Sequence, residues 1–145
     1  MLIELVSFST ENAEFFNQAM NIRFTVFSKE LGIDKNIEFD GLDYEQAVHY
    51  LVIIDSKPIA TLRWRQTKEG IIIDKLAVLK EYRHLSIGQL LLRHVLQELK
   101  KSKKKIYLNS YVELTGFFNN HNFDVISEPF ESNNRKVVKM IYKKK

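Results

Sequence analysis

Apolar positions along the chain follow two different spacings, and segments of the two kinds alternate. Seven short segments are rich in β-branched and other apolar residues and are bounded by turn residues, which predicts strands. The expected strands cover residues 2–8, 47–54, 59–66, 71–79, 105–111, 123–126 and 137–142. Three other segments place apolar residues three or four positions apart, which predicts helices. The first begins after Ser9 or Thr10 as N-cap, and the others cover about residues 87–101 and 113–121.

The order of these elements predicts a mixed sheet. The turns DSKP and TKEG join the second, third and fourth strands closely enough for an antiparallel meander. Helices separate most of the other strands, so the pattern indicates an α/β fold whose sheet is flanked by helices. A chain of 145 residues with 45% hydrophobic content and no Pro- or Ser-rich linker is expected to form a single domain, residues 1–145.

Composition argues against several classes of function. The chain has no cysteine, which excludes disulfides, thiolate nucleophiles and cysteine-rich zinc sites. Its four histidines do not pair at the i, i+4 spacing of a helical metal site, so no metal is expected. Much of the excess positive charge lies in the lysine runs at 100–105 and 143–145, which lack interleaved aromatic residues, so we expect no nucleic-acid partner. Neither a signal peptide nor a membrane-spanning run is visible, which predicts a cytoplasmic protein without membrane contact.

The polar turn after the fourth expected strand is a candidate anion site. Ser86 and Gln89 have the spacing of a capping box, which would start a helix whose free N–H groups face the end of the preceding strand. Gly88 lies in the first turn, where a phosphate can approach the backbone, and Lys80 and Arg83 can supply positive charge. The fingerprints of P-loop and dinucleotide-binding proteins are absent from the sequence.

The segment L-A-V-x-x-x-Y-R-x-x-S-I-G, from Leu76 to Gly88, resembles the acyl-CoA-binding motif of the GNAT N-acetyltransferases. The resemblance continues along nearly the whole chain, through IRFTVFSKELGI at 22–33, D-x-x-x-A-x-H at 43–49 and LNSYVELTGFFNNHNF at 108–123. It implies the GNAT fold, with a mostly antiparallel mixed sheet of about six to seven strands and a splayed cleft for acyl-CoA.

The resemblance also implies an activity. GNAT proteins transfer an acetyl group from acetyl-CoA, as co-substrate, to an amine on a small molecule or a peptide. Because no cysteine can carry the acetyl group, we expect direct transfer in a ternary complex. The alternatives are an acyl-CoA-binding regulatory module that has lost catalysis and, less favoured, nucleic-acid binding by the lysine runs. The oligomeric state is open, with a homodimer as one alternative.

Cofactor contacts follow from the resemblance, position by position. The fourth strand would bind pantetheine through Leu76, Ala77 and Val78, and the turn and helix start would bind the pyrophosphate. The pyrophosphate set comprises Arg83, His84, Leu85, Ser86, Ile87, Gly88 and Gln89. Asn109 and Phe118 are assigned to the same cofactor. Ser86 departs from the family pattern, which has glycine there, although its hydroxyl could donate to the same phosphate.

The residue that usually acts as general acid in the family is missing from this chain. Many relatives place a tyrosine in the last helix as general acid toward the CoA thiolate, and this chain has Phe118 at that position. General acid help contributes about 10²-fold or more, so its loss slows transfer without abolishing it. Tyr111 is a possible substitute, and packing at the sheet edge is the alternative interpretation of that residue.

Base catalysis and acceptor binding have several candidates. Asp74 shares strand parity with Leu76 and could deprotonate the incoming amine, as could His49, for which a hydrogen-bonded core position is the alternative. Five acidic residues lie in the expected loop 32–46, and Glu38 and Asp40 are predicted to bind a cationic amine. Arg63 is predicted to meet either an acceptor carboxylate or a structural acid.

Overall fold

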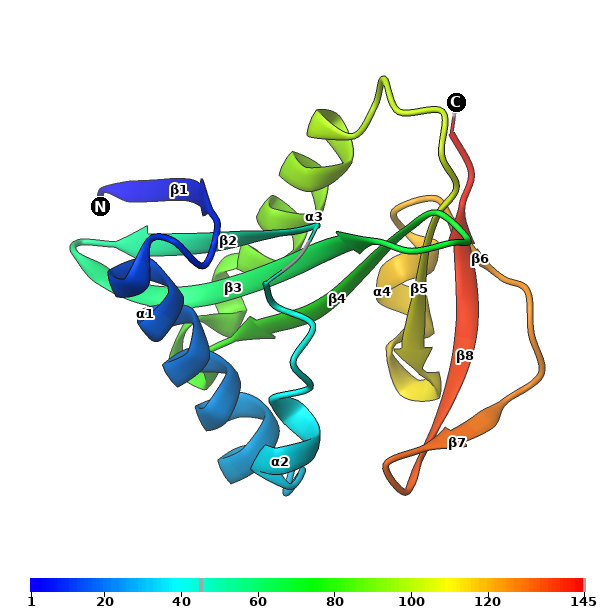
Figure 1. The fold of residues 1–145 in the computed structure, drawn as a ribbon, viewed down its shortest axis with the longest axis horizontal. Coiled ribbons are helices and arrows are strands. Elements are labelled where there is room, and N and C mark those ends of the chain that lie inside the picture. Colours follow the sequence, from blue (N-terminus) through cyan, green and yellow to red (C-terminus); the bar gives the residue numbers. More distant parts are fainter. Residues whose placement is uncertain (45, 145) are drawn as a thin grey trace.

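The apolar runs of the sequence pair into one eight-stranded sheet, seen in a computed structural model that describes residues 1–44 and 46–144 (Figure 1). The strands are β1 (Ile3–Phe8), β2 (Ala47–Ile54), β3 (Lys57–Gln66), β4 (Ile71–Val78), β5 (Ile106–Tyr111), β6 (Phe123–Val125), β7 (Phe130–Ser132) and β8 (Arg135–Tyr142). The helical segments are α1 (Ala13–Arg23), the π-helix η1 (Phe24–Glu30), α2 (Lys35–Glu38), the 3₁₀ helix η2 (Lys80–Leu85), α3 (Ile87–Glu98), the 3₁₀ helix η3 (Val112–Leu114) and α4 (Thr115–Asn119). This is the mixed, mostly antiparallel sheet with helices that the sequence predicts.

The strand order is β1-β2-β3-β4-β5-β8-β6, and β7 pairs with β8. The pair β4–β5 is parallel, and the other pairs are antiparallel. The helix α3 makes the crossover between the two parallel strands, as a parallel connection requires. The meander expected from the short turns is therefore confirmed as β2-β3-β4.

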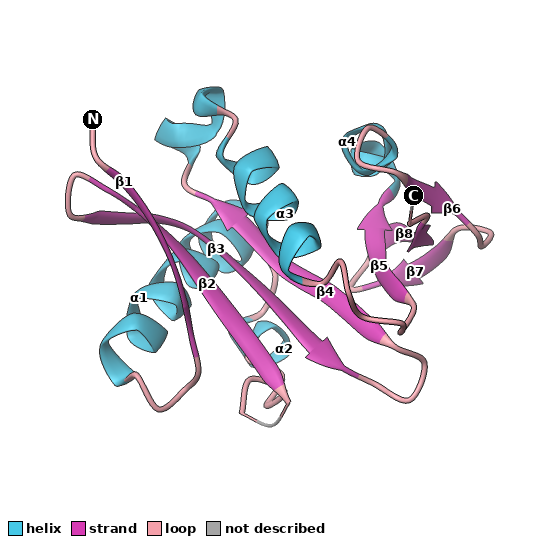
Figure 2. Cartoon of the chain, turned by 90° about the horizontal axis from the view of Figure 1, so that it is seen from above, coloured by secondary structure: helices cyan, strands magenta, loops and turns pink. Residues whose placement is uncertain are grey.

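Helices cover both faces of the sheet (Figure 2). Successive side chains of a strand point to opposite faces, so β2 contributes to two hydrophobic clusters. Leu51 packs in the cluster that contains Ala19, Ile22 and Val26 of the first helical region. Tyr50 and Val52 belong to the larger cluster on the other face, which is built around the α3 residues Leu91, Leu92 and Val95. Both layers hold β4 in place, because Ile73 belongs to the larger cluster and Ala77 to the smaller one.

The feature that positions the site is the separation of β4 from β5. Parallel pairing joins Ile71 to Ile106 and Ile72 to Tyr107, and beyond these pairs the two strands diverge (Figure 2). Gly70 lies just before the junction with φ of +156°, and a Cβ there would stand 2.3 Å from the Lys105 carbonyl oxygen. The close approach of the two backbones at this junction therefore requires glycine.

The sequence prediction is wrong at several ends and short segments. The N-cap of α1 is Asn12, whose Oδ1 accepts from the Phe15 N–H at 3.1 Å, and neither Ser9 nor Thr10 caps it. The expected loop 32–46 contains α2, and the strand β7 was missed because its three residues are exposed and carry no apolar alternation. The prediction of strand positions is confirmed to within about two residues for the other seven strands.

Ser86 does not form the predicted capping box. Its φ of 57° and ψ of 33° are left-handed, and its side chain makes no cap hydrogen bond to the start of α3. The left-handed backbone turns Oγ away from the helix N–H groups, whereas a capping residue adopts β-region angles. Gln89 lies beside Arg93, 3.0 Å from Nη2 when its amide oxygen faces the guanidinium.

Within residues 1–44 and 46–144, none of the helices has the length and apolar character needed to cross a membrane.

Candidate active site

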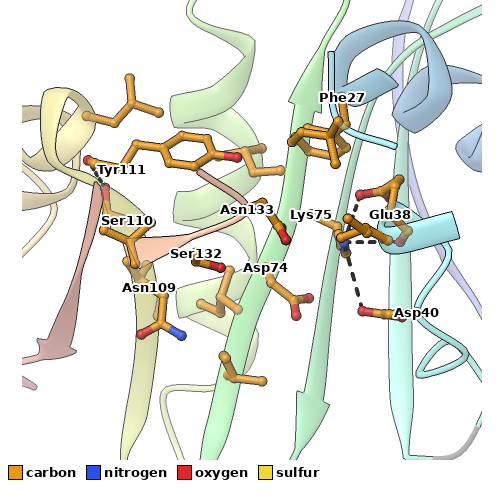
Figure 3. Close-up of a pocket in the computed structure, with 18 of the residues that line it drawn as sticks. Phe27, Glu38, Asp40, Asp74, Lys75, Asn109, Ser110, Tyr111, Ser132 and Asn133 are labelled. Carbon is orange, nitrogen blue, oxygen red and sulfur yellow. Dashed lines mark hydrogen bonds and ion pairs between the residues drawn. The ribbon is translucent and has the colours of Figure 1, made fainter. Parts of the chain in front are cut away.

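A cavity of about 300 Å³ lies where β4 and β5 diverge (Figure 3). Strand residues form its sides, while η1 and α2 close one end and the β7–β8 turn closes the other. It brings together seven of the site residues predicted from the sequence: Glu38, Asp40, Asp74, Leu76, Asn109, Tyr111 and Phe118. Residues as far apart in sequence as Glu38 and Phe118, 80 positions, therefore share one cavity because the sheet splays there.

A network of ion pairs runs beneath and along one side of the cavity. Four carboxylates and four cationic side chains take part: Glu38, Asp40, Asp43 and Asp74 with Arg23, Arg63, Arg65 and Lys75. Their formal charges cancel when all eight are ionised. Three acids of the loop, Glu38, Asp40 and Asp43, are thus paired with basic residues from other elements of the fold.

Glu38 has a cation at each carboxylate oxygen. Its Oε1 lies 2.6 Å from Arg23 Nε, and its Oε2 lies 2.7 Å from Lys75 Nζ (Figure 3). Glu38 and Arg23 are almost fully buried, with side-chain exposures of 2% and 1%. Lys75 reaches this carboxylate from a bulge in β4, where its φ is +56°. Glu38 lines the cavity as predicted, but its charge is already compensated.

Arg63 is the centre of the network. Its Nε and Nη2 donate to the two Asp74 carboxylate oxygens, each at 2.8 Å, and its Nη1 donates to Asp43 Oδ1 at 2.9 Å. Two further hydrogen bonds of 3.1 Å reach Asp40. The side chain is 1% exposed, and its partners are the structural acids of the second predicted role.

These contacts fix the protonation of the network. Burial would raise the pKa of Asp40, but hydrogen bonds from Arg63 and the Leu42 N–H hold it at about 2. Burial likewise opposes ionisation of Asp43, and Arg23 and Arg63 together keep its pKa below the ordinary value. Burial would lower the pKa of Arg63, yet Asp74 and Asp40 raise it. Asp40, Asp43 and Arg63 therefore stay ionised near neutral pH.

His49 lies in the core, which matches the hydrogen-bonded core position given as its alternative interpretation. Its side chain is buried, with a residue exposure of 1%, and Nε2 lies 3.0 Å from the Asp43 carbonyl oxygen. The ring stacks on Phe8 with centroids 5.5 Å apart and meets the edge of Phe16. Burial lowers the pKa of His49, which favours the neutral ring in this aromatic setting. It does not belong to the cavity lining.

Tyr111 points across the cavity from the end of β5 (Figure 3). The Arg135 guanidinium lies 5.1 Å from the centre of its ring, which fixes the ring from the β8 side. Burial raises the pKa of Tyr111, so its hydroxyl keeps its proton at neutral pH. Among the described cavity residues it is the one phenol, and a protonated phenol can donate to a developing anion.

Phe118 lines the same cavity from α4, as predicted. Its ring packs edge-on against Phe117 and Phe123, with centroid distances of 5.1 and 6.0 Å. An apolar ring at this position presents no proton to the cavity. Phe118 therefore cannot supply the acid that a tyrosine at this position would provide.

The start of α3 lies at the other end of the diverging strands. The first N–H groups of this 12-residue helix lack a side-chain cap, because Ser86 is left-handed. A Cβ on Gly88 would lie 3.7 Å from Phe117 Cζ and 4.0 Å from Val78 Cγ2, so the missing side chain leaves space between β4 and α4. Ile87 is buried and faces the core, and its backbone alone is available to a ligand.

The Arg83 guanidinium already forms hydrogen bonds within the protein. Its Nε donates to the Val78 carbonyl at 2.9 Å, and its Nη1 and Nη2 form a bidentate pair with Glu30 at 2.5 and 2.8 Å. Both side chains are partly exposed, at 40% and 32%. This pair links η1 to η2 across the mouth of the cleft. His84 and Leu85 follow in η2 as exposed and half-exposed residues.

Of the four cations in the network, only Arg63 was predicted from the sequence, whereas Arg23, Arg65 and Lys75 were not. Arg23 stands four residues after Ala19 and three before Val26, which are both buried, so a charged residue occupies a core position of the helix pattern. A charge at such a position needs a partner, and the acidic loop supplies it. That helical spacing, together with the surplus of acids in 32–46, was the available signal.

Comparison with known proteins agrees with this geometry. The chain is similar to the N-acetyltransferase YjcF of Bacillus subtilis, at 26% identity over 119 residues that cover 81% of this chain and 84% of that protein. Its fold matches Escherichia coli ElaA with a TM-score of 0.89 at 20% identity, covering 98% and 100% of the two chains. It also matches the PaiA N-acetyltransferase of Thermoplasma acidophilum in complex with coenzyme A, with a TM-score of 0.68 at 16% identity over 98% and 100%. The model of the acetyltransferase (GNAT) domain family matches residues 11–144, and the chain therefore belongs to the GNAT acetyltransferase family.

Proposed function

We propose that this protein transfers an acetyl group from acetyl-CoA to an amine, by direct attack of the amine on the thioester. The observation that carries the proposal is the cleft between β4 and β5, with the uncapped α3 start at one end and the Tyr111 cavity at the other. A helix start with free N–H groups and a glycine in its first turn suits a pyrophosphate. The CoA-bound PaiA structure supports the same choice of co-substrate.

The chemistry requires two proton transfers. As the amine nitrogen bonds to the acetyl carbon and the carbon–sulfur bond breaks, the nitrogen must lose a proton and the thiolate must gain one. The Tyr111 hydroxyl lies in the cavity, is protonated and is the candidate donor to the thiolate. Asp74 accepts from Arg63 at both oxygens, so the lone pairs that would receive a proton from the amine are already engaged. We therefore assign the proton on nitrogen to water rather than to Asp74.

Binding is tested by titration of CoA against wild type and Gly88→Glu. The added carboxylate would enter the space between β4 and α4 and repel a pyrophosphate, so CoA binding should fall by more than about tenfold. Gln97→Glu is the matched control, because it adds the same charge to an exposed position near the end of α3. CoA affinity that is equal in both variants and in wild type contradicts the assigned site.

Phe118 favours one rival function, an acyl-CoA-binding module that has lost catalysis. Thiol release from acetyl-CoA in the presence of amines separates the two, since the module would bind CoA and release none. Phe118→Tyr adds a hydroxyl with little change of volume, and an active enzyme should gain turnover while its CoA affinity stays nearly constant. An acyl-CoA-binding module without catalysis should show no turnover in Phe118→Tyr either.

A further inference from the structure

The acceptor cavity carries three carboxylates, and each of them already accepts from a cation of the protein. Glu38 pairs with Arg23 and Lys75, Asp40 pairs with Arg63, and Asp74 pairs with Arg63 and with Arg65 at 3.4 Å. With Asp43 included, the network has four carboxylates and four cationic side chains, and their formal charges cancel. Among the residues that the structure describes, the cavity therefore has no carboxylate without a cationic partner.

We propose that the acceptor is an amine on an apolar, uncharged body, and that amines with a second positive charge are selected against. The inference rests on the proposed function, because it specifies the substrate class of the same cavity. It covers free amines and the N-terminus of an apolar peptide, which present the same chemistry.

A second ammonium group would have to displace a cation of the network. Lys75 and Arg63 hold their carboxylates through hydrogen bonds of 2.7 and 2.8 Å in largely buried surroundings. Breaking such a pair leaves a buried charge without its partner, which is costly. A polyamine or an amino sugar would also lose water from its extra ammonium group without gaining an unpaired carboxylate.

Apolar side chains form the walls around this balanced network. Three of them are large, line the cavity and are substantially exposed: Ile37 at 48%, Leu114 at 48% and Phe130 at 43%. They stand on α2, on η3 and on β7, so they surround the entrance from both sides of the cleft. Covering exposed apolar surface favours binding in proportion to its area.

The remaining polar groups of the cavity are uncharged. Asn109, Ser132 and Asn133 face it from β5 and from the β7–β8 turn (Figure 3). Amide and hydroxyl groups can bind a peptide group or a hydroxyl of the acceptor, and they do not select for charge. The lining therefore combines apolar surface with neutral hydrogen-bonding groups.

The test compares two sets of amines of similar size. Phenethylamine, benzylamine and the amide of an apolar dipeptide form the first set, and putrescine, spermidine and an aminoglycoside form the second. Binding to the CoA-saturated protein is measured by calorimetry, and turnover is measured separately by thiol release from acetyl-CoA. We expect the first set to exceed the second by about tenfold or more in affinity and in kcat/KM, which corresponds to about two buried methylene groups.

Two variants test the stated cause. Lys75→Met removes one cation and leaves the network with a net negative charge, so it should shift preference toward putrescine by about tenfold, the worth of one hydrogen bond to a charged group. Lys68→Met makes the same change at an exposed turn residue outside the cavity and should shift nothing. Ile37→Ser alters an exposed wall and should weaken phenethylamine several-fold while leaving putrescine unchanged.

The two readouts separate failure of the inference from failure of the proposed function. Apolar amines that bind without any thiol release support the inference and refute the transferase. Efficient acetylation of spermidine or the aminoglycoside in preference to phenethylamine refutes the inference and leaves the transferase intact. Absence of binding by every amine overturns the inference as well, and so does an unchanged preference in Lys75→Met.

Discussion

Substitution of Arg63 by methionine should strongly lower the free energy of unfolding. The reason is that this one buried side chain donates five hydrogen bonds to three carboxylates. Removing one partner of a buried ion pair costs about 3–5 kcal/mol. For a domain of this size each kcal/mol lowers Tm by about 2–4 °C, so the fall should be about 6–20 °C. Urea unfolding followed by circular dichroism gives the free energy directly.

Arg65→Met is the matched control. Arg65 contacts Asp74 at 3.4 Å and is 21% exposed, so its loss should cost about 1 kcal/mol or less. Both variants replace an arginine of β3 by methionine. We expect a large loss of stability at Arg63 and a small loss at Arg65. Equal losses in the two variants would refute the central position given to Arg63.

The deficit of Arg63→Met should also depend on pH, with a sign fixed by the structure. In wild type the pKa of Asp40 is depressed to about 2, so this carboxylate stabilises the fold above its ordinary pKa of 3.8 and loses that contribution as pH falls through about 2. Without Arg63, burial raises the pKa of the orphaned carboxylates, and they take up protons as the solution is acidified. The free-energy difference between variant and wild type should therefore shrink between about pH 7 and pH 4, and a constant difference would contradict the charge argument.

Three further predictions concern the cleft. Glu30→Gln should free Arg83 for CoA and tighten its binding about two- to fivefold, while Glu81→Gln on η2, which lacks the bidentate pair, should change the calorimetric affinity less. Tyr111→Phe should lower kcat about 10²-fold with CoA affinity unchanged, because the ring is kept and the proton is lost; an unaltered rate would assign thiolate protonation to water. Ser86→Gly should stabilise the fold by about 1 kcal/mol, seen as a higher Tm, because glycine adopts the left-handed angles without a Cβ penalty; a lower Tm would mean that the hydroxyl holds the turn.

Much of the fold could be predicted because its central strands are long and apolar. The strand β2 was predicted with its observed bounds, since six of its eight residues are buried and they point to both faces of the sheet. Short elements escaped prediction for the opposite reason. The exposed β7 has a single apolar residue, Phe130, and exists because β8 offers it an edge to pair with.

The location of the site could be predicted from the sequence, but the partners and roles of its charged residues could not. The residue pattern placed Asp74 and Tyr111 on the fourth and fifth expected strands, and the GNAT resemblance implied that these strands splay. Both residues line the cavity. Sequence could not reveal that Asp74 is held by Arg63, since the two residues meet across a strand pair, or that Glu38 meets Arg23 over 15 positions. Pairing between distant charges depends on the completed fold. The loop sequence by itself therefore suggests a negatively charged site, whereas in the folded protein its cavity carboxylates are paired with cations.

The junction at Ile71–Ile106 and Ile72–Tyr107 gives the sheet the mechanics of a hinge. Residues 106–142 supply the second leaf, which joins the first leaf through this short parallel pairing, through the segment after α3 and through a shared hydrophobic core that includes Leu108 and Met140. The opening angle of the leaves sets the width of the cleft. A molecule that touches both leaves fixes that angle, so backbone amides across the second leaf become slower to exchange with deuterium together, as one block.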